Sequence, residues 1–133
     1  MLYIVRHGKA TGKDENAVLT EEGIKETELI ASKIKISPTI IYSSPLPRAK
    51  QTAEIFSKYT GAKVVILDVL RPEKDPSMLK SFSYDGVMLV GHNPMISNYL
   101  SSLLNYQIEL GNSCIAGIEK TLKLLICPEY LKS

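Results

Sequence analysis

Short, continuously apolar segments that alternate with helix-forming segments constrain the fold of this chain more than any other feature. A run that is apolar at every position, rather than at every second one, is typical of a strand buried on both faces. Helical spacing of apolar residues, as at Ile24, Ala31 and Ile34, predicts amphipathic helices between such runs. We expect strands over 2–5, 39–42, 64–67 and 87–90, helices over 21–35, 48–59 and 94–104, a short helix over 76–82, and two further strands within 113–126.

This alternation predicts an α/β fold with three layers, α/β/α, in which helices cover both faces of a mostly parallel central sheet. The chain has 133 residues, which is enough to bury one core, so we expect a single domain over 1–133. Two local signals support the helix assignments. Thr20 is a favourable N-cap, and Gly61 is a favourable C-terminal cap.

Composition excludes several classes of protein. The 16 Lys and Arg residues nearly balance the 14 Asp and Glu, so the net charge is only +2, which argues against a nucleic-acid binder. The N-terminus has too few consecutive apolar residues for a signal peptide, and no apolar run approaches the ~20 residues of a membrane span. Two cysteines, Cys114 and Cys127, favour a reducing cytoplasm, and a disulfide between them is left open. A monomer or a small homo-oligomer fits these features.

Polar clusters follow three of the predicted strands directly. They are Arg6-His7-Gly8, then Ser43-Ser44-Pro45 with Arg48 close behind, and Gly91-His92-Asn93. The carboxyl ends of parallel strands meet at one edge of the sheet, where ligands of this fold class bind. Paired arginines match phosphate oxygens, and a neutral histidine can accept a phosphoryl group covalently. The sequence therefore predicts a phosphoryl-binding pocket, which Gly8 lets the backbone approach closely.

These residues also have other interpretations. One histidine after a strand is more often structural than functional, and it is the placement of both histidines, His7 and His92, that favours a site. A metal centre would need a third ligand at suitable spacing, and no carboxylate flanks either histidine in that way. Gly12-Lys13 lacks the remainder of a phosphate-binding loop. Cys114 is expected in the core rather than as a nucleophile.

The chain resembles the histidine phosphatase superfamily, which has the phosphoglycerate mutase-like fold. The resemblance rests on Arg6-His7-Gly8, on the segment from Ser43 to Thr52 (SSPLPRAKQT), on His92 between Val90 and Pro94, and on the LTEEG helix start at 19–23. It implies a metal-independent phosphatase without cofactors, in which His7 is the phosphorylated nucleophile. Arg6, Arg48 and His92 would hold the phosphate, with help from Gly8 and Asn93.

Within that superfamily the chain is similar to the small SixA-type phosphohistidine phosphatases. The similarity lies in its length, in the segments 70–76 and 113–116, and in His92-Asn93-Pro94. No part of the chain remains for the cap domain that covers the pocket of larger relatives, so we expect an open site. Many relatives use a carboxylate as general acid. Glu73 is the first candidate here, with Asp75 and Asp68 as alternatives, and a phosphoramidate leaving group would depend less on such an acid.

The resemblance therefore implies a phosphatase whose substrate is phosphohistidine in a protein. Two alternatives stay open at this point. The first is a small-molecule phosphomonoesterase of the same superfamily, and the second is a non-catalytic phosphate-binding module on the same fold.

Overall fold

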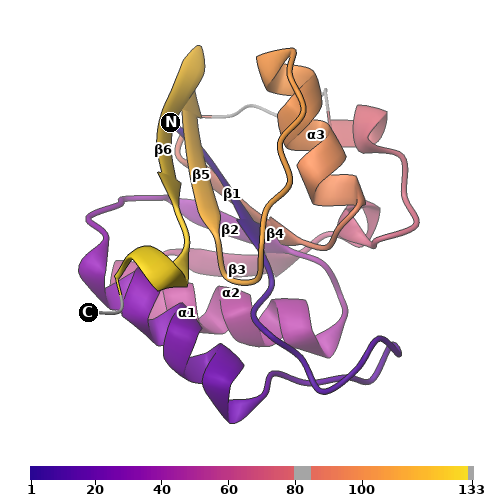
Figure 1. Cartoon of the computed structure of the whole chain (residues 1–133), viewed down its shortest axis with the longest axis vertical. Coiled ribbons are helices and arrows are strands. Elements are labelled where there is room, and N and C mark those ends of the chain that lie inside the picture. The colour runs from indigo at the N-terminus through magenta and orange to yellow at the C-terminus, as the bar shows by residue number, and fades with distance from the viewer. Residues whose placement is uncertain (80–84, 132–133) are drawn as a thin grey trace.

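A mixed six-stranded sheet in the order β3-β2-β4-β1-β5-β6 forms the centre of the fold (Figure 1). The structure, a computed structural model, describes residues 1–79 and 85–131. Four strands run parallel, and the last two add an antiparallel hairpin beside β1. The strands are β1 (Leu2–Arg6), β2 (Ile40–Ser43), β3 (Lys63–Ile66), β4 (Val87–Gly91), β5 (Ile115–Glu119) and β6 (Thr121–Ile126).

Helices cover both faces of the sheet, as the sequence predicts. Helices α1 (Glu21–Lys33) and α2 (Pro47–Thr60) lie on one face, and α3 (Met95–Leu104) lies on the other (Figure 1). Short 3₁₀ helices connect the elements at η1 (Asp68–Leu70), η2 (Pro76–Leu79) and η3 (Pro128–Tyr130). The predicted helix over 76–82 is thus a 3₁₀ turn over 76–79, and 80–82 lie outside the described residues.

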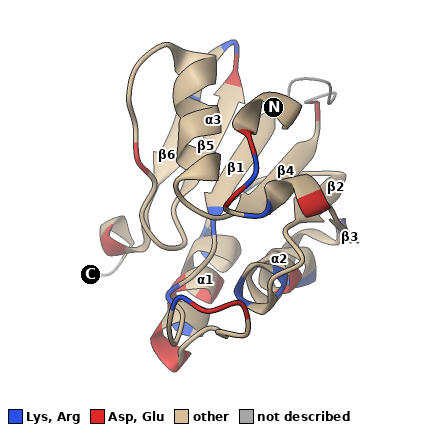
Figure 2. Ribbon diagram, turned by 90° about the vertical axis from the view of Figure 1, so that its right-hand side faces the viewer, with Lys and Arg blue, Asp and Glu red and all other residues tan. Residues whose placement is uncertain are grey.

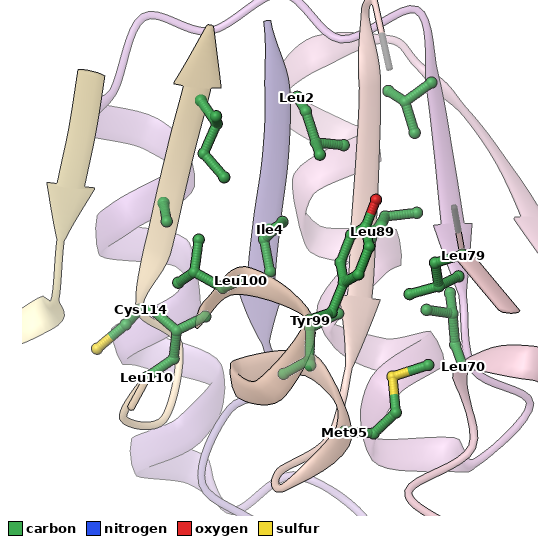
Figure 3. Close-up of a cluster of buried hydrophobic side chains, with 14 residues drawn as sticks. Leu2, Ile4, Leu70, Leu79, Leu89, Met95, Tyr99, Leu100, Leu110 and Cys114 are labelled. Atoms are coloured by element: carbon green, nitrogen blue, oxygen red, sulfur yellow. The ribbon is translucent and has the colours of Figure 1, made fainter. Parts of the chain in front are cut away.

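The burial of β1 on both faces explains why its sequence is apolar without alternation. Leu2 and Ile4 pack with α3 in one cluster, and Tyr3 and Val5 pack with α1 and α2 in the other. Figure 3 shows Leu2 and Ile4 on the same side as Tyr99 and Leu100 of α3. Each fully buried aliphatic side chain contributes about 1.5–3 kcal/mol. The central strand is therefore well anchored, and so is the chain that leaves its carboxyl end.

Both predicted caps are present. The Thr20 hydroxyl accepts a hydrogen bond from the Gly23 amide at 2.9 Å, which satisfies a free donor at the start of α1. Gly61 ends α2 in the left-handed conformation, with a φ of 76°. These two caps fix the ends of the helices that flank the first face of the sheet.

Cys114 and Cys127 form a disulfide. The sequence favoured a reducing environment and left this pairing open, and the structure joins the two residues. They lie at the matching ends of β5 and β6, just outside the Ile115–Ile126 pair, so the hairpin itself brings them together. Cys114 is buried in the cluster on the α3 side, as expected for a core residue (Figure 3).

Among the described residues, no helix combines the length and apolar character needed to cross a lipid bilayer.

Candidate active site

The two histidines meet at the carboxyl edge of the sheet because β1 and β4 are adjacent parallel strands. Arg6 pairs with Gly91 in register, so His7 and His92 are the next residues of neighbouring strands. The His7 amide donates to the Gly91 carbonyl at 3.0 Å, which continues the sheet hydrogen bonds. The ring centroids of the histidines lie 4.9 Å apart at an angle of 54°. The sheet therefore places both imidazoles side by side.

A pocket of about 480 Å³ opens at this point. Four cationic side chains and both imidazoles line it, and none of the described residues that line it is a carboxylate. The lining consists of Arg6, His7, Lys9, Ala10, Gly12, Lys13, Arg48, Pro72, His92, Asn93 and Asn112. The structure thus brings together Arg6, His7, Arg48, His92 and Asn93, which the sequence placed at one site.

His7 is held so that one ring nitrogen stays available. Its Nδ1 lies 2.7 Å from the Gly8 carbonyl oxygen, which can only accept, so Nδ1 carries the proton and donates it. The pKa of His7 is lowered to about 4, chiefly by burial and also by the charges of Arg48 and Arg6, while the Gly8 hydrogen bond acts to raise it. At neutral pH the ring is uncharged, and Nε2 has a free lone pair.

His92 is also buried and neutral. Its Nε2 lies 2.7 Å from the hydroxyl oxygen of Ser44, at the end of β2. The pKa of His92 is lowered to about 3, chiefly by burial, with His7, Arg48, Arg6 and Arg71 acting in the same direction. The other ring nitrogen, Nδ1, is buried without a hydrogen-bond partner. It is the one ring nitrogen of His92 that the described part of the protein leaves without a partner.

The two arginines reach the pocket from different elements. Arg48 lies in the first turn of α2, is buried, and donates from Nη1 to the Asp14 carbonyl at 2.9 Å. Arg6 ends β1 and donates from Nη1 to the Leu110 carbonyl at 3.3 Å. Desolvation lowers the pKa of Arg6, which nevertheless stays charged at neutral pH, while Glu109 acts to raise it. Both guanidinium groups keep further N–H donors for a ligand.

Close packing explains why position 8 is a glycine. A Cβ atom there would lie 2.8 Å from Thr27 Oγ1 and 3.0 Å from Ser113 Oγ. The Gly8 amide donates to Thr52 Oγ1 at 3.0 Å, and the Thr27 and Ser113 hydroxyls are 2.8 Å apart. These three buried hydroxyls, from α1, α2 and the segment before β5, pack around the turn that contains His7. Gly8 is thus needed for packing beside the pocket.

The predicted general acids do not line the pocket. Asp68 pairs with Arg71 at 2.8 Å and with Lys74 at 3.5 Å, and the Asp75 carboxylate accepts from the Ser77 amide at 2.9 Å. Glu73 is exposed and is not among the lining residues. The segment after β3 contributes Pro72 to the lining instead.

Asn112 and Lys13 line the pocket and were not predicted from the sequence. Asn112 Nδ2 donates to the His7 carbonyl at 3.3 Å, across a separation of 105 residues that leaves no local signal. Lys13 was considered only as part of a phosphate-binding loop. Its position seven residues after the end of the first strand, in the loop that follows, was the available clue. Asn93, which was predicted, has its side chain fixed by the Leu110 carbonyl, 2.8 Å away, and by the Ser97 hydroxyl.

This arrangement suits chemistry at an anionic phosphorus or a similar centre. A neutral nitrogen nucleophile lies beside fixed positive charges and donors, which stabilise the negative charge of a transferring phosphoryl group. No group of three or more His, Cys, Asp or Glu side chains suited to a metal ion occurs in the part of the chain that the structure describes.

Comparison with known proteins agrees with this chemical interpretation of the pocket. The family model for the histidine phosphatase superfamily (branch 1) matches residues 2–72, which include Arg6, His7 and Arg48 but not His92. A curated relative from Photorhabdus laumondii, which carries the name phosphoglycerate mutase GpmB, is 33% identical over 78 residues. That match covers 53% of this chain and 36% of the relative, so the chain accounts for about a third of its length.

Solved structures match the fold over most of its length. The protein histidine phosphatase SixA, solved with tungstate, has a TM-score of 0.83 at 23% identity and covers 98% of both chains. A protein of Agrobacterium tumefaciens that carries the name phosphohistidine phosphatase SixA has a TM-score of 0.75 at 26% identity. That match covers 86% of this chain and 87% of the other.

Proposed function

Because this chain belongs to the histidine phosphatase superfamily, we propose that it is a phosphatase that works through a phosphohistidine intermediate on His7. The observation that carries this proposal is the state of His7. Its Nδ1 proton is held by the Gly8 carbonyl at 2.7 Å, and Nε2 is free to attack in a pocket that also contains Arg6, Arg48 and His92.

The reaction has two steps, and the same pocket serves both. In the first, the Nε2 lone pair forms a bond to phosphorus while the bond from phosphorus to the leaving group breaks with its electron pair. The leaving group then takes a proton from solvent. In the second, water attacks phosphorus, the bond to Nε2 breaks, and inorganic phosphate and free His7 result. Arg6, Arg48 and His92 hold the phosphoryl oxygens in both transition states.

We propose that the substrate is phosphohistidine on another protein. The described residues lining the pocket provide no carboxylate to protonate a departing alkoxide, as Glu73, Asp75 and Asp68 all lie elsewhere. An imidazole leaves phosphorus more readily than an alkoxide does, so this pocket fits a phosphoramidate better than a phosphate ester. The likeness to SixA structures supports the same substrate class. We further propose that the reaction needs no metal ion and no cofactor.

A small-molecule phosphomonoesterase is the second candidate. The relative that carries the name phosphoglycerate mutase favours it, because such proteins act on a small phosphate ester. The non-catalytic alternative is less well supported, because a phosphate binder has no need of a nucleophile with a committed tautomer such as His7.

Brief incubation with ³²P-labelled substrate followed by denaturation tests the mechanism. We expect an adduct that is labile to acid and stable to alkali in the wild type and absent in His7→Ala. An adduct that persists in His7→Ala would disprove the covalent role of His7. A wild type that neither forms an adduct nor hydrolyses substrate would favour the binding module.

Two comparisons rank the enzymatic alternatives. If a phosphohistidine-bearing protein is turned over faster than p-nitrophenyl phosphate and 3-phosphoglycerate, the substrate is phosphohistidine. The reverse order supports a small-molecule phosphomonoesterase. Activity that survives EDTA is expected, and its loss would overturn metal independence.

A further inference from the structure

We propose that Ser44 is a positioning residue that holds His92 in the tautomer with its proton on Nδ1. This inference rests on the proposed function, since it concerns how His92 meets a phosphoryl oxygen. Ser44 does not contact the reacting atoms itself. It acts through the His92 ring.

The hydrogen bonds around Ser44 determine the direction of its contact with His92. Ser44 is fully buried, and its amide donates to the Val90 carbonyl at 3.1 Å, which fixes the end of β2 beside β4. Its hydroxyl oxygen accepts from the Leu46 amide at 3.1 Å and lies 2.7 Å from His92 Nε2. A hydroxyl has one proton to donate and two lone pairs that accept.

Two arrangements of the proton between Ser44 and His92 can be compared. If His92 Nε2 carried the proton, the Ser44 oxygen would accept twice, and its own proton would be buried without an acceptor among the described residues. If instead the Ser44 hydroxyl donates to Nε2, the Ser44 hydroxyl and Nε2 are both satisfied, and only His92 Nδ1 lacks a partner in the protein. The first arrangement leaves two buried groups without a partner, the Ser44 proton and His92 Nδ1, and the second leaves only Nδ1. Unpaired buried polar groups are costly, so the second arrangement is favoured.

The consequence appears on the other side of the His92 ring. With Nε2 accepting, a neutral imidazole must carry its proton on Nδ1, the nitrogen that is buried without a protein partner. His92 lines the pocket beside His7, so this N–H is a donor prepared for a phosphoryl oxygen. In the opposite tautomer, a lone pair would face the phosphoryl oxygens and repel them. Ser44 thus lets His92 donate while it remains uncharged.

The first test is the tautomer of His92 in the wild type, which needs no variant. The chain has only two histidines, so a long-range ¹H–¹⁵N correlation spectrum at neutral pH contains two imidazole patterns, and His7→Gln assigns them. We expect both rings to show the Nδ1-protonated tautomer, His7 through Gly8 and His92 through Ser44. An Nε2-protonated His92 would overturn the proposal.

Variants at the end of β2 form the second test. In Ser44→Ala we expect a mixture of His92 tautomers and an affinity for inorganic phosphate about five- to tenfold weaker, whereas Ser44→Thr keeps the hydroxyl and restores the tautomer. Ser43→Ala is the matched control, because Ser43 is equally buried but donates only to the Ser44 carbonyl. An unchanged tautomer and phosphate affinity in Ser44→Ala would overturn the proposal.

The outcome is separable from that of the proposed function. Tautomers and phosphate affinity are measured without turnover, and adduct formation at His7 is measured without reference to His92. A wild type with the expected tautomer but no adduct would disprove the catalytic proposal and leave the role of Ser44 intact.

Discussion

At the level of single residues, the site combines two uncharged histidines, His7 and His92, with four cationic side chains. Arg6, Lys9, Lys13 and Arg48 share the pocket with the histidines. Burial and neighbouring positive charge lower the pKa of His7 to about 4 and of His92 to about 3. A protonated His7 would lose its lone pair and could not attack phosphorus. The surroundings that we propose bind an anion would therefore also keep the proposed nucleophile, His7, in its reactive form.

These lowered pKa values predict loss of stability in mild acid. Above the unfolded-state pKa of 6.5 both states carry neutral rings. As the pH falls below 6.5, the histidines become protonated in the unfolded state but stay neutral in the folded state. The free energy of unfolding therefore decreases until the pH reaches the folded-state pKa values, near 4 and 3. Each histidine contributes a slope of about 1.4 kcal/mol per pH unit at most.

Urea unfolding at several pH values between 7 and 4.5 measures this effect. The variants His7→Gln and His92→Gln remove one titrating group each, and each should show a shallower loss of stability than the wild type. Equal slopes in all three proteins would contradict the lowered pKa values. Carboxylates elsewhere titrate equally in the wild type and the variants, so the difference isolates the histidines.

A second residue-level prediction concerns Arg48. Arg48→Ala removes both the charge and the paired donors, so we expect inorganic phosphate to bind about 100-fold more weakly, or about 3 kcal/mol. Arg48→Lys keeps the charge, and we expect a loss of about tenfold. Titration calorimetry measures both.

Arg71→Ala is the matched control for Arg48. Arg71 is paired with Asp68 and Glu15 and does not line the pocket. Its replacement should leave phosphate affinity within about twofold. If Arg48→Ala bound phosphate as tightly as this control, Arg48 would have no part in holding the phosphate.

At the level of elements, the segment 110–114 before β5 supports the site from one side. The Leu110 carbonyl accepts from Arg6, Asn112 donates to the His7 carbonyl, and the Ser113 amide donates to the Arg6 carbonyl at 3.1 Å. The segment ends at Cys114, whose disulfide partner Cys127 closes the β5–β6 hairpin. The disulfide therefore restrains the segment that positions both Arg6 and His7.

Reduction of this disulfide should weaken both stability and phosphate binding. The cysteines are 13 positions apart, and a closed loop of that size contributes up to about 3 kcal/mol. Urea midpoints and phosphate affinity with and without dithiothreitol measure the two effects. The variant with Cys114→Ala and Cys127→Ser should not respond to the reductant. Two reactive thiols in the native, unreduced protein would show that the bond does not form in solution.

The sequence predicted the elements well because each strand and helix carries its own local signal. The strands at 2–6, 40–43, 63–66 and 87–91 lie within a residue or so of their predicted positions, since each is a short apolar run and three of the four end at a polar cluster. Thr20 and Gly61 fixed helix ends through short-range hydrogen bonds. The 3₁₀ turns η1 and η2 were harder to predict, because prolines and mixed charges there fit a loop equally well.

For the whole molecule, the layers could be predicted but the order of the strands could not. The site exists because β1 lies between β4 and β5, a pairing of residues more than 80 positions apart. No local sequence pattern specifies which strands pair with β1. For the same reason the predicted site contained Arg6, His7, Arg48 and His92, which follow strands, but neither Asn112 nor the Ser44 contact to His92, which depend on tertiary packing.

At the scale of the whole molecule, the charge near the pocket differs from the net charge of the chain. The net charge is only +2, and Figure 2 shows basic and acidic positions on the same helices and loops rather than on separate faces. The pocket, in contrast, has four cationic side chains and no carboxylate among its described lining residues. A concave surface of one sign concentrates its field, so we expect the pocket to attract anionic substrates despite the nearly balanced total.

Lys13 allows this attraction to be measured, because it is an exposed residue of the pocket lining. Lys13→Gln should lower kcat/KM for an anionic substrate about two- to threefold at low ionic strength and much less at 0.5 M salt, where screening acts over roughly 4 Å. Lys123→Gln, the same change on the exposed strand β6, should leave kcat/KM unchanged at both salt concentrations. If the two variants behaved alike, net charge rather than the local field would govern substrate capture. If Lys13→Gln lost the same factor at every ionic strength, Lys13 would contact the substrate directly instead of attracting it from a distance.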